Sequence, residues 1–343
     1  MATWKKIRYR LEWLALMAAL KTIPLLSRET CYQLARLIGG LAATLDRSGR
    51  RVALSNLEAA FGDEFSPARR AEIVRESYQD LARTMVDLFW SPRLDAQNLS
   101  QYIEFEGLEQ MRIDAGPKRC FIAGAFHYGN FEWISLGCGW LGFIGLIAMQ
   151  EFKNPLLNRF FQDLRELSGH TTVLRDGAMI RLFKILRKKE GLVALLVDTT
   201  LPPHQPTVVI DCFGLKTIVT VAHAWLQERT GAPIIPLYCE PLGRGRCRVV
   251  AQPKVQIPEG ATHQQIAQAC WDAFEPVVRK NPAPWLWMYK HWRYKPAGAG
   301  GYPFYANESP AFDQVAARPN YAKLDREPAV VLRLTARRAR CER

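Results

Sequence analysis

Residues 120–133 read CFIAGAFHYGNFEW and combine an apolar run with a dense group of polar side chains. The run from Cys120 to Phe126 is too short for a typical helix and therefore predicts a buried strand. His127 follows it directly, and the pair Gly129–Asn130 indicates a turn that opens a helix. Reactive side chains of α/β sheets gather where strands end. The stretch thus predicts an active site at the carboxyl end of this strand.

Apolar runs of the same kind alternate with helical patterns beyond residue 100. Further strands are expected at Phe143–Met149, Leu192–Val197, Val208–Phe213 and Ile234–Cys239. Helices are expected between them at Leu156–Leu167, Met179–Lys189 and Val219–Arg229. This alternation is typical of the α/β class, in which helices cover the faces of a sheet.

Two apolar stretches, residues 11–26 and 32–45, lie near the start of the chain and follow several lysines and arginines. Glu12, Lys21 and Pro24 interrupt the first, which falls short of the ~20 clean apolar residues of a spanning helix. We predict membrane-associated helices that lie in the bilayer surface. A pair of helices packed on the protein's own core and a single spanning helix remain the alternatives.

Three regions are expected along the chain. Residues 1–46 form the membrane-associated helical anchor, and residues 47–296 form the catalytic domain, beginning with helices over about 47–95 where apolar positions recur at helical spacing. The run AGAGGYP after Pro296 breaks regular structure. Residues 297–343, rich in proline and arginine, are predicted to form a mobile basic tail.

Composition limits the partners of the chain. With 46 basic and 33 acidic residues among 343, the net charge of +13 favours anionic partners. No nucleic-acid-reading motif occurs, so we expect no nucleic acid partner. The 8 cysteines are scattered without a CxxC pair, which predicts reduced, buried thiols. The histidines show no metal-ligand spacing.

The pair His127 and Glu132 suggests general-base chemistry. The two residues lie five apart across the predicted turn, so the carboxylate can fold back toward the imidazole. A neutral histidine removes a proton from a hydroxyl near pH 7 because its pKa is close to that value. Glu132 would then fix the tautomer of the ring and stabilise the imidazolium that forms.

The run GNFE after His127 resembles the H-x4-D/E block of the lysophospholipid acyltransferase superfamily, in particular the GNWE form of the late acyltransferases of lipid A biosynthesis. Further blocks agree in order and spacing over the range from about Trp13 to Pro296. They are KNPLL at 153–157 with Arg165 and Gly169 following, GLVALLVD at 191–198, CFG at 212–214, RTGAPIIP at 229–236 and WLWMYKHWR at 285–293.

The resemblance implies a glycerolipid acyltransferase-like fold, an α/β domain with a mixed sheet flanked by helices. It also implies an enzyme on the cytoplasmic face of the cell inner membrane, without cofactor or metal. Such an enzyme moves a fatty acyl chain from acyl carrier protein or acyl-CoA to a hydroxyl of an anionic glycolipid, such as a lipid A precursor. By position, His127 would be the base and Glu132 its partner. The substrate-binding residues would be Lys153, Arg165, Arg175 and Asp198, with Arg159 as a further possible phosphate ligand.

Three departures from the family pattern bear on the acceptor more than on the reaction. The chain has Asp198–Thr199 where Asp-Gln is common, Cys212 where the first Phe of Phe-Phe-Gly is usual, and Asn281–Trp285 in place of Pro-x-Gln-x-Trp. A phospholipid or phosphatidylinositol-mannoside acyltransferase is therefore the alternative within the enzyme class. A non-catalytic membrane-binding scaffold is the alternative outside it, and the absence of a G-x-S-x-G motif argues against a serine hydrolase.

The aromatic run Trp285–Trp292 allows two readings. It would either seat the protein at the bilayer interface or pack as an aromatic core helix. His291 within it is expected to be a structural histidine rather than a second base.

Overall fold

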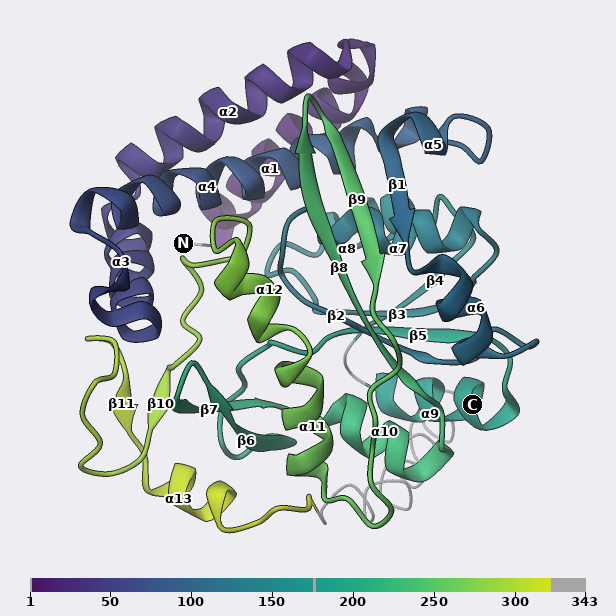
Figure 1. The fold of residues 1–343 in the computed structure, drawn as a ribbon. Coiled ribbons are helices and arrows are strands. Elements are labelled where there is room, and N and C mark those ends of the chain that lie inside the picture. Colours follow the sequence, from purple (N-terminus) through teal and green to yellow (C-terminus); the bar gives the residue numbers. More distant parts are fainter. Residues whose placement is uncertain (1, 175–176, 322–343) are drawn as a thin grey trace.

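The computed structural model describes residues 2–174 and 177–321, which fold around a seven-stranded mixed sheet of order β1-β9-β8-β2-β5-β3-β4 (Figure 1). Neighbouring strands are parallel except β8 and β9, which are antiparallel. The strands of this sheet are β1 Ile103–Glu106, β2 Ile122–Ala125, β3 Gly145–Met149, β4 Thr171–Leu174, β5 Leu192–Leu196, β8 Ile234–Gly243 and β9 Arg246–Ala251. The prediction of an α/β fold with a sheet flanked by helices is confirmed.

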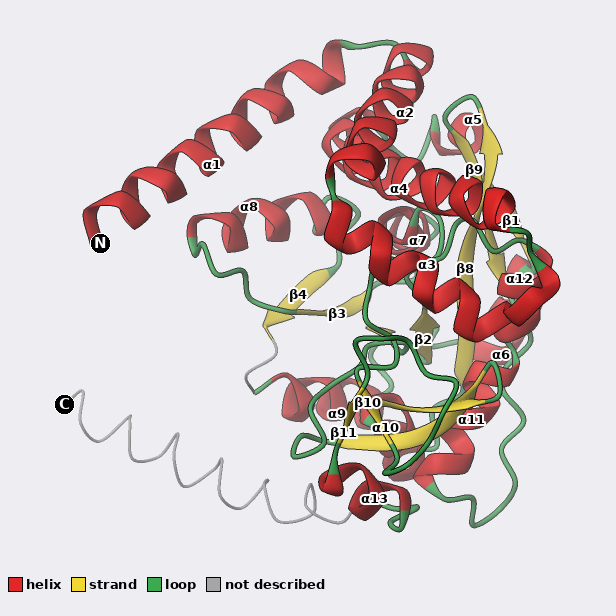
Figure 2. Cartoon of the chain, turned by 90° about the vertical axis from the view of Figure 1, so that its left-hand side faces the viewer, coloured by secondary structure: helices red, strands yellow, loops and turns green. Residues whose placement is uncertain are grey.

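Helices cover both faces of the sheet (Figures 1 and 2). The helices of the first half of the chain are α1 Ala2–Thr22, α2 Arg28–Leu45, α3 Arg47–Phe61, α4 Pro67–Trp90, α5 Leu99–Tyr102, α6 Leu108–Ala115, α7 Phe131–Trp140 and α8 Leu156–Arg165. Those of the second half are α9 Ala178–Lys188, α10 Ala222–Thr230, α11 His263–Asp272, α12 Glu275–Lys280 and α13 Pro310–Ala316. Short 3-10 turns occupy Ile23–Leu25, Gly62–Glu64 and Ser91–Arg93.

Alternate residues of the central strands enter two separate cores. Ile122 of β2 and Ile234 of β8 pack with α9, α10 and α11, whereas Ala123 and Ile235 pack with α4, α7 and α8. Successive side chains of a strand point to opposite faces, so each central strand contributes to both cores. The sheet is therefore buried on both sides, as its continuous apolar runs predict.

The N-terminal helices differ in how they are held. Helix α2 packs on α4 through buried Cys31, Ala35, Gly39 and Ala43, and a Cβ at Gly39 would lie 2.4 Å from the Cα of Gln79. The opposite face of α2 leaves Leu37, Ile38, Leu41 and Leu45 exposed. Helix α1 projects beside α8 and has no buried side chain from residue 4 onward (Figure 2). Within the described residues, no helix has the length and hydropathy needed to cross a membrane. Association of these helices with a membrane surface stays a prediction.

The predicted start of one helix is wrong. The helix expected at Val219–Arg229 begins only at Ala222, because Val219 and Thr220 end strand β7. This strand, Leu215–Thr220, pairs with β6, Thr207–Cys212, in an antiparallel hairpin apart from the main sheet.

The tail predicted to begin at residue 297 is folded at least to α13. Strands β10, Tyr294–Lys295, and β11, Asn307–Glu308, pair with each other. Phe312 of α13 is fully buried against Val209 and Ile218 of the hairpin. This apolar contact holds the segment on the body, and the remaining arginine-rich residues 322–343 lie outside the described residues.

The aromatic run enters the core rather than the surface. Trp285, Trp287 and Trp292 are almost completely buried, and the run forms turns rather than the helix considered from sequence. The seven cysteines of the described part are buried and free, which confirms reduced thiols there. Cys341 lies outside that part.

Candidate active site

His127 lies just beyond the end of β2, and a segment from the aromatic run braces its backbone. Tyr128 forms an isolated antiparallel bridge with Trp285, and the carbonyl of His127 accepts a hydrogen bond of 3.1 Å from the Leu286 amide. Gly129 has φ +55°, and a Cβ there would lie 1.8 Å from the Cys239 carbonyl oxygen. Only glycine fits this turn, so the backbone that presents His127 is tightly fixed.

The carboxylate that holds the imidazole is Asp198. Its Oδ1 lies 2.8 Å from Nδ1 of His127, and its Oδ2 accepts from the His127 amide at 3.0 Å and from Nε1 of Trp285 at 3.1 Å. Asp198 itself is buried. Since an ionised carboxylate only accepts hydrogen bonds, Nδ1 carries a proton and Nε2 remains for a substrate.

The pKa values of the two partners reflect this contact. Burial disfavours the imidazolium, but the charge and hydrogen bond of Asp198 outweigh it and raise the pKa of His127 above its ordinary value. Burial likewise works against the carboxylate, yet His127 and Trp285 hold the pKa of Asp198 below its usual range. The pair is therefore arranged to stabilise the proton that a general base would take up.

The carboxylate of Glu132 does not bond the imidazole of His127, so the predicted contact between these two side chains is wrong. Its carboxylate instead forms a two-point ion pair with Arg165 of α8, at 2.5 Å to Nη2 and 2.9 Å to Nε. The Glu132 side chain is 5% exposed and that of Arg165 is 17% exposed. A buried guanidinium requires a counter-charge, and Glu132 in the first turn of α7 supplies it.

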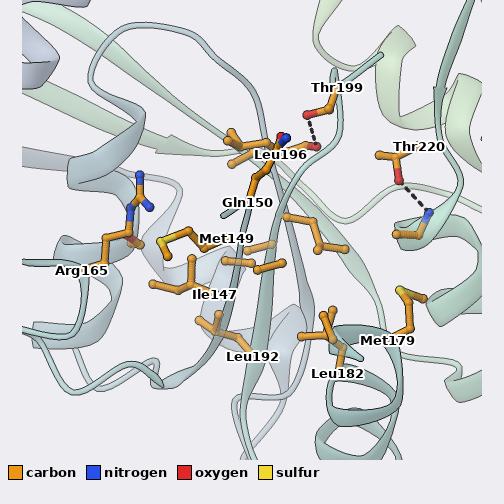
Figure 3. A pocket seen from close by; sticks show the side chains of 18 of the residues that line it. Ile147, Met149, Gln150, Arg165, Met179, Leu182, Leu192, Leu196, Thr199 and Thr220 are labelled. Carbon is orange, nitrogen blue, oxygen red and sulfur yellow. Dashed lines mark hydrogen bonds between the residues drawn. The ribbon is translucent and has the colours of Figure 1, made fainter. Parts of the chain in front are cut away.

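A large cavity opens at these residues and extends along the sheet (Figure 3). Its volume is about 1610 Å³, above the ~300 to 1,000 Å³ common for ligand pockets. His127, Glu132 and Arg165 line it together with mostly apolar side chains from both faces of the sheet. These side chains include Ala123, Ala125, Ile134, Ile147, Met149, Phe161, Met179, Leu182, Leu192, Ala194, Leu196 and Trp225.

Small side chains create much of this space. Ala123 of β2 lies in register with Ala194 of β5, and both belong to the cavity wall. Ser135 and Cys138 of α7 line the cavity as well. A narrow layer of small residues between a sheet and a helix leaves a passage that suits a hydrocarbon chain.

The predicted substrate-binding residues separate in the structure. Arg165 lines the cavity, whereas Asp198 lies behind His127 and, among the residues that the structure describes, bonds His127 and Trp285 rather than an arginine. Lys153 is exposed and absent from the cavity wall, and exposed Arg159 pairs with Asp163 at 2.8 Å. Arg175 lies outside the described residues.

Three basic residues that the sequence analysis did not select also line the cavity. Lys184, Arg187 and Lys188 of α9 line it and are exposed. Their spacing of three and four residues, in a helix predicted from sequence, was the available signal. These exposed side chains add positive charge to the wall of a chamber whose lining is mostly apolar.

No other histidine offers the same combination in the described part of the chain. His170 lines the cavity, but its ring bonds only backbone groups, the Gly145 amide at 3.3 Å and the Ser135 carbonyl at 2.7 Å, and burial lowers its pKa. His291 is stacked on Trp285, its Nε2 lies 2.9 Å from the Leu286 carbonyl oxygen, and burial lowers its pKa to about 4, in keeping with the expected structural role. Among the residues described, no cluster of His, Cys, Asp and Glu suits a metal ion.

Comparison with known proteins gives two results. A family model described as "Bacterial lipid A biosynthesis acyltransferase" matches residues 2–294. The phosphatidylinositol mannoside acyltransferases of Mycobacterium tuberculosis strains H37Rv and CDC 1551 are each 24% identical over 225 residues, covering 63% of this chain and 69% of the relative.

Proposed function

Because the chain belongs to the bacterial lipid A biosynthesis acyltransferases and is an acyltransferase, we propose that His127 is its general base and that Asp198 orients it. The observation that carries this proposal is the 2.8 Å contact between Nδ1 and the carboxylate at the mouth of an apolar cavity. It leaves Nε2 as the proton acceptor.

The reaction follows from that geometry. Nε2 takes the proton of an acceptor hydroxyl while the hydroxyl oxygen attacks the carbonyl carbon of a fatty acyl thioester. The carbon–sulfur bond breaks, and the imidazolium returns the proton to the departing thiolate. General-base assistance of this kind contributes ~10² to 10⁴ in rate. Asp198 stabilises the imidazolium between the two steps.

Glu132 acts through Arg165 in this scheme. The carboxylate occupies Nε and Nη2 of the guanidinium and thereby fixes its orientation in the cavity wall. The Nη1 group of Arg165 then remains as a donor for a polar group of the substrate. Glu132 and Arg165 together would bind and orient substrate beside His127.

The apolar cavity suits the acyl chains of the substrates. Its volume of about 1610 Å³ exceeds that of a usual single-ligand pocket, so we assign it to the donor acyl chain together with part of the acceptor lipid. The exposed basic residues of α9 in the cavity wall suit an anionic headgroup or the phosphate of a thioester donor. We propose acyl carrier protein or acyl-CoA as donor and a glycolipid such as a lipid A precursor as acceptor.

A phosphatidylinositol mannoside is the second candidate acceptor. The specific observation in its favour is the similarity to the mycobacterial phosphatidylinositol mannoside acyltransferases. Both acceptors are anionic lipids that bear sugar hydroxyls, so the same base would serve either of them.

We propose that the protein acts at a bilayer surface, on the cytoplasmic face of the inner membrane. Helix α2 exposes Leu37, Leu41 and Leu45, and α1 exposes Trp4, Ile7, Leu11 and Leu14 next to the basic residues of the N-terminus. Such a combination favours insertion at the headgroup level of an anionic bilayer.

The experiment that tests the proposal is mass spectrometry of total lipid from one host that expresses wild type, His127→Ala or His204→Ala at matched levels. His204 is an exposed histidine outside the cavity wall, so its variant controls for the substitution itself. A lipid heavier by one acyl chain should appear with wild type and His204→Ala only. If His127→Ala produces the same lipid, the proposed base is wrong.

A further inference from the structure

Asp87 is a fully buried carboxylate of α4 that does not line the cavity. Its two oxygens serve two different elements. Oδ1 forms an ion pair of 2.8 Å with Nη2 of Arg28 in α2, and Oδ2 accepts a hydrogen bond of 2.8 Å from Nδ2 of Asn130. A single buried side chain therefore joins an N-terminal helix to the sequence motif that carries His127 and Glu132.

Asn130 is the N-terminal cap of α7. Its Oδ1 accepts from the Trp133 amide at 3.1 Å, while its Nδ2 is held by Asp87. The indole Nε1 of Trp133 donates to the Asp87 carbonyl at 3.2 Å and to the Ser91 hydroxyl at 2.9 Å. The first turn of α7, which contains Glu132, is thus attached to α4 at several points.

Arg28 closes the network from the other side. Its guanidinium lies 4.6 Å from the ring centroid of Trp90 and 4.9 Å from that of Trp133, and Nη2 also donates to the Gly245 carbonyl at 2.6 Å. Its Nε and Nη1 have no hydrogen-bond partner in the described structure, so the aromatic faces and Asp87 stabilise the charge. The charge of Arg28 in turn fixes the position of Asp87.

We propose that Asp87 is a positioning residue for acyl transfer: held by Arg28, it orients the Asn130 cap and so sets the place of α7, Glu132 and Arg165 beside His127. The inference rests on the proposed function, because it assumes that this site transfers acyl groups. It assigns to α2 a part in catalysis that is separate from any contact with a membrane.

The orientation of Asn130 explains why a neutral amide cannot replace Asp87. In Asp87→Asn the new side chain presents an NH2 group toward Arg28 or toward Nδ2 of Asn130, where only an acceptor fits. If the NH2 group faces Asn130, the Asn130 amide must turn, which removes its oxygen from the Trp133 amide; if it faces Arg28, Arg28 loses the counter-charge that holds this side chain in place. A displacement of about 1 Å at a reacting group lowers a rate by up to ~10²-fold.

Three variants test the proposal. Asp87→Asn breaks the link, and Asn130→Ser keeps a capping oxygen but is too short to reach Asp87. Asp80→Asn is the matched control, because Asp80 is another carboxylate of α4, with a side chain only 14% exposed, whose ion pair with Arg83 at 2.5 Å stays within that helix. Each is measured for kcat and KM with purified enzyme, and for hydrogen exchange in a peptide covering residues 128–136.

We expect Asp87→Asn and Asn130→Ser to lower kcat 10- to 100-fold with KM within a factor of two, and Asp87→Asn to exchange faster in the first turn of α7. Asp80→Asn should do neither, even where its melting temperature falls. If Asp87→Asn does not fold, the kcat of Asn130→Ser decides whether the link matters.

Wild-type kcat in the folded variants, or equal exchange in Asp87→Asn and Asp80→Asn, overturns the role of Asp87. Absence of transfer by wild-type enzyme overturns the proposed function instead, and with it the rate claim, while the exchange data still report on the link.

Discussion

Nδ1 of His127 lies 2.8 Å from Oδ1 of Asp198 although 71 positions separate the two residues along the chain. The sheet explains the contact, because Ala125 of β2 is paired with Leu196 of the neighbouring parallel strand β5. Two residues beyond each member of that pair come His127 and Asp198. The contact between the proposed base and its carboxylate partner is therefore set by strand register.

Asp198→Asn should lower kcat by roughly 10²- to 10⁴-fold while the protein stays folded. An amide in place of the carboxylate cannot stabilise the imidazolium and no longer enforces the tautomer with a free Nε2. Steady-state kinetics with a thioester donor, beside circular dichroism for the fold, is the measurement. A loss of less than threefold would show that Asp198 does not orient the base.

The pH dependence of kcat/KM should have a rising limb above the ordinary pKa of histidine. Asp198 raises the pKa of His127, so the neutral base is lost as pH falls through that raised value. In Asp198→Asn the limb should move to lower pH, because the pKa of His127 falls when its counter-charge is removed. A limb that stays at the same pH in both proteins would assign it to another group.

Glu132→Gln and Arg165→Gln should each lower the free energy of unfolding by about 3 kcal/mol or more, since each leaves one buried charge without its partner. The double variant should lose less than the sum of the two. Urea unfolding of the four proteins in a double-mutant cycle measures the coupling. Strict additivity would mean that the ion pair does not contribute in solution.

Ala194→Leu should shift the acyl preference toward shorter chains, because the added carbons enter the cavity. Substrates that differ by one methylene in an apolar pocket differ by about 1 to 3 kcal/mol in transition-state free energy. Competition between acyl donors of different length, read by mass spectrometry, reports the shift. The control Ala35→Leu adds the same group in the packed contact of α2, where it should lower stability by about 1 to 3 kcal/mol without changing chain preference.

Leu37→Glu combined with Leu41→Glu should weaken binding to vesicles of phosphatidylglycerol and phosphatidylethanolamine by more than tenfold. Both leucines are exposed on α2, and a buried leucine is worth about 1.5 to 3 kcal/mol. Co-sedimentation is the assay, and Ile113→Glu, at a residue 71% exposed on α6, is the control. Equal pelleting of all three proteins would place the membrane contact elsewhere.

Strands β2, β3, β5, β6 and β8 and most helices were predictable because each has a local signature. The runs at residues 120–126 and 192–197 are apolar, short and bounded by polar residues, and they are β2 and β5 in the structure. Strands β1, β4 and β9 of the main sheet were missed; β1 and β4 are only four residues long with two apolar residues each, and β9 begins with two arginines in three residues. The folded segment at α13 was missed because the Gly- and Pro-rich run before it is typical of an end of regular structure. Buried Phe312 nevertheless anchors α13 on the body.

The site itself was predictable in its members but not in its pairings. His127, Glu132, Arg165 and Asp198 were all selected, yet Glu132 was assigned to His127 because five residues separate them. Neighbours across a parallel sheet are distant in sequence, and their order depends on crossovers that no local pattern records. Knowing that β2 and β5 are adjacent would have placed Asp198 on His127.

The strand order also constrains how the chain reaches its native state. Strands β2 and β3 follow each other in the sequence but never pair, since β5 enters between them. The centre of the sheet must stay open until the chain beyond residue 190 has been made, and pairings of such long range form slowly. Strand β5, which completes the centre of the sheet, also leads into Asp198, so the core closes and the His127–Asp198 contact forms in the same folding step.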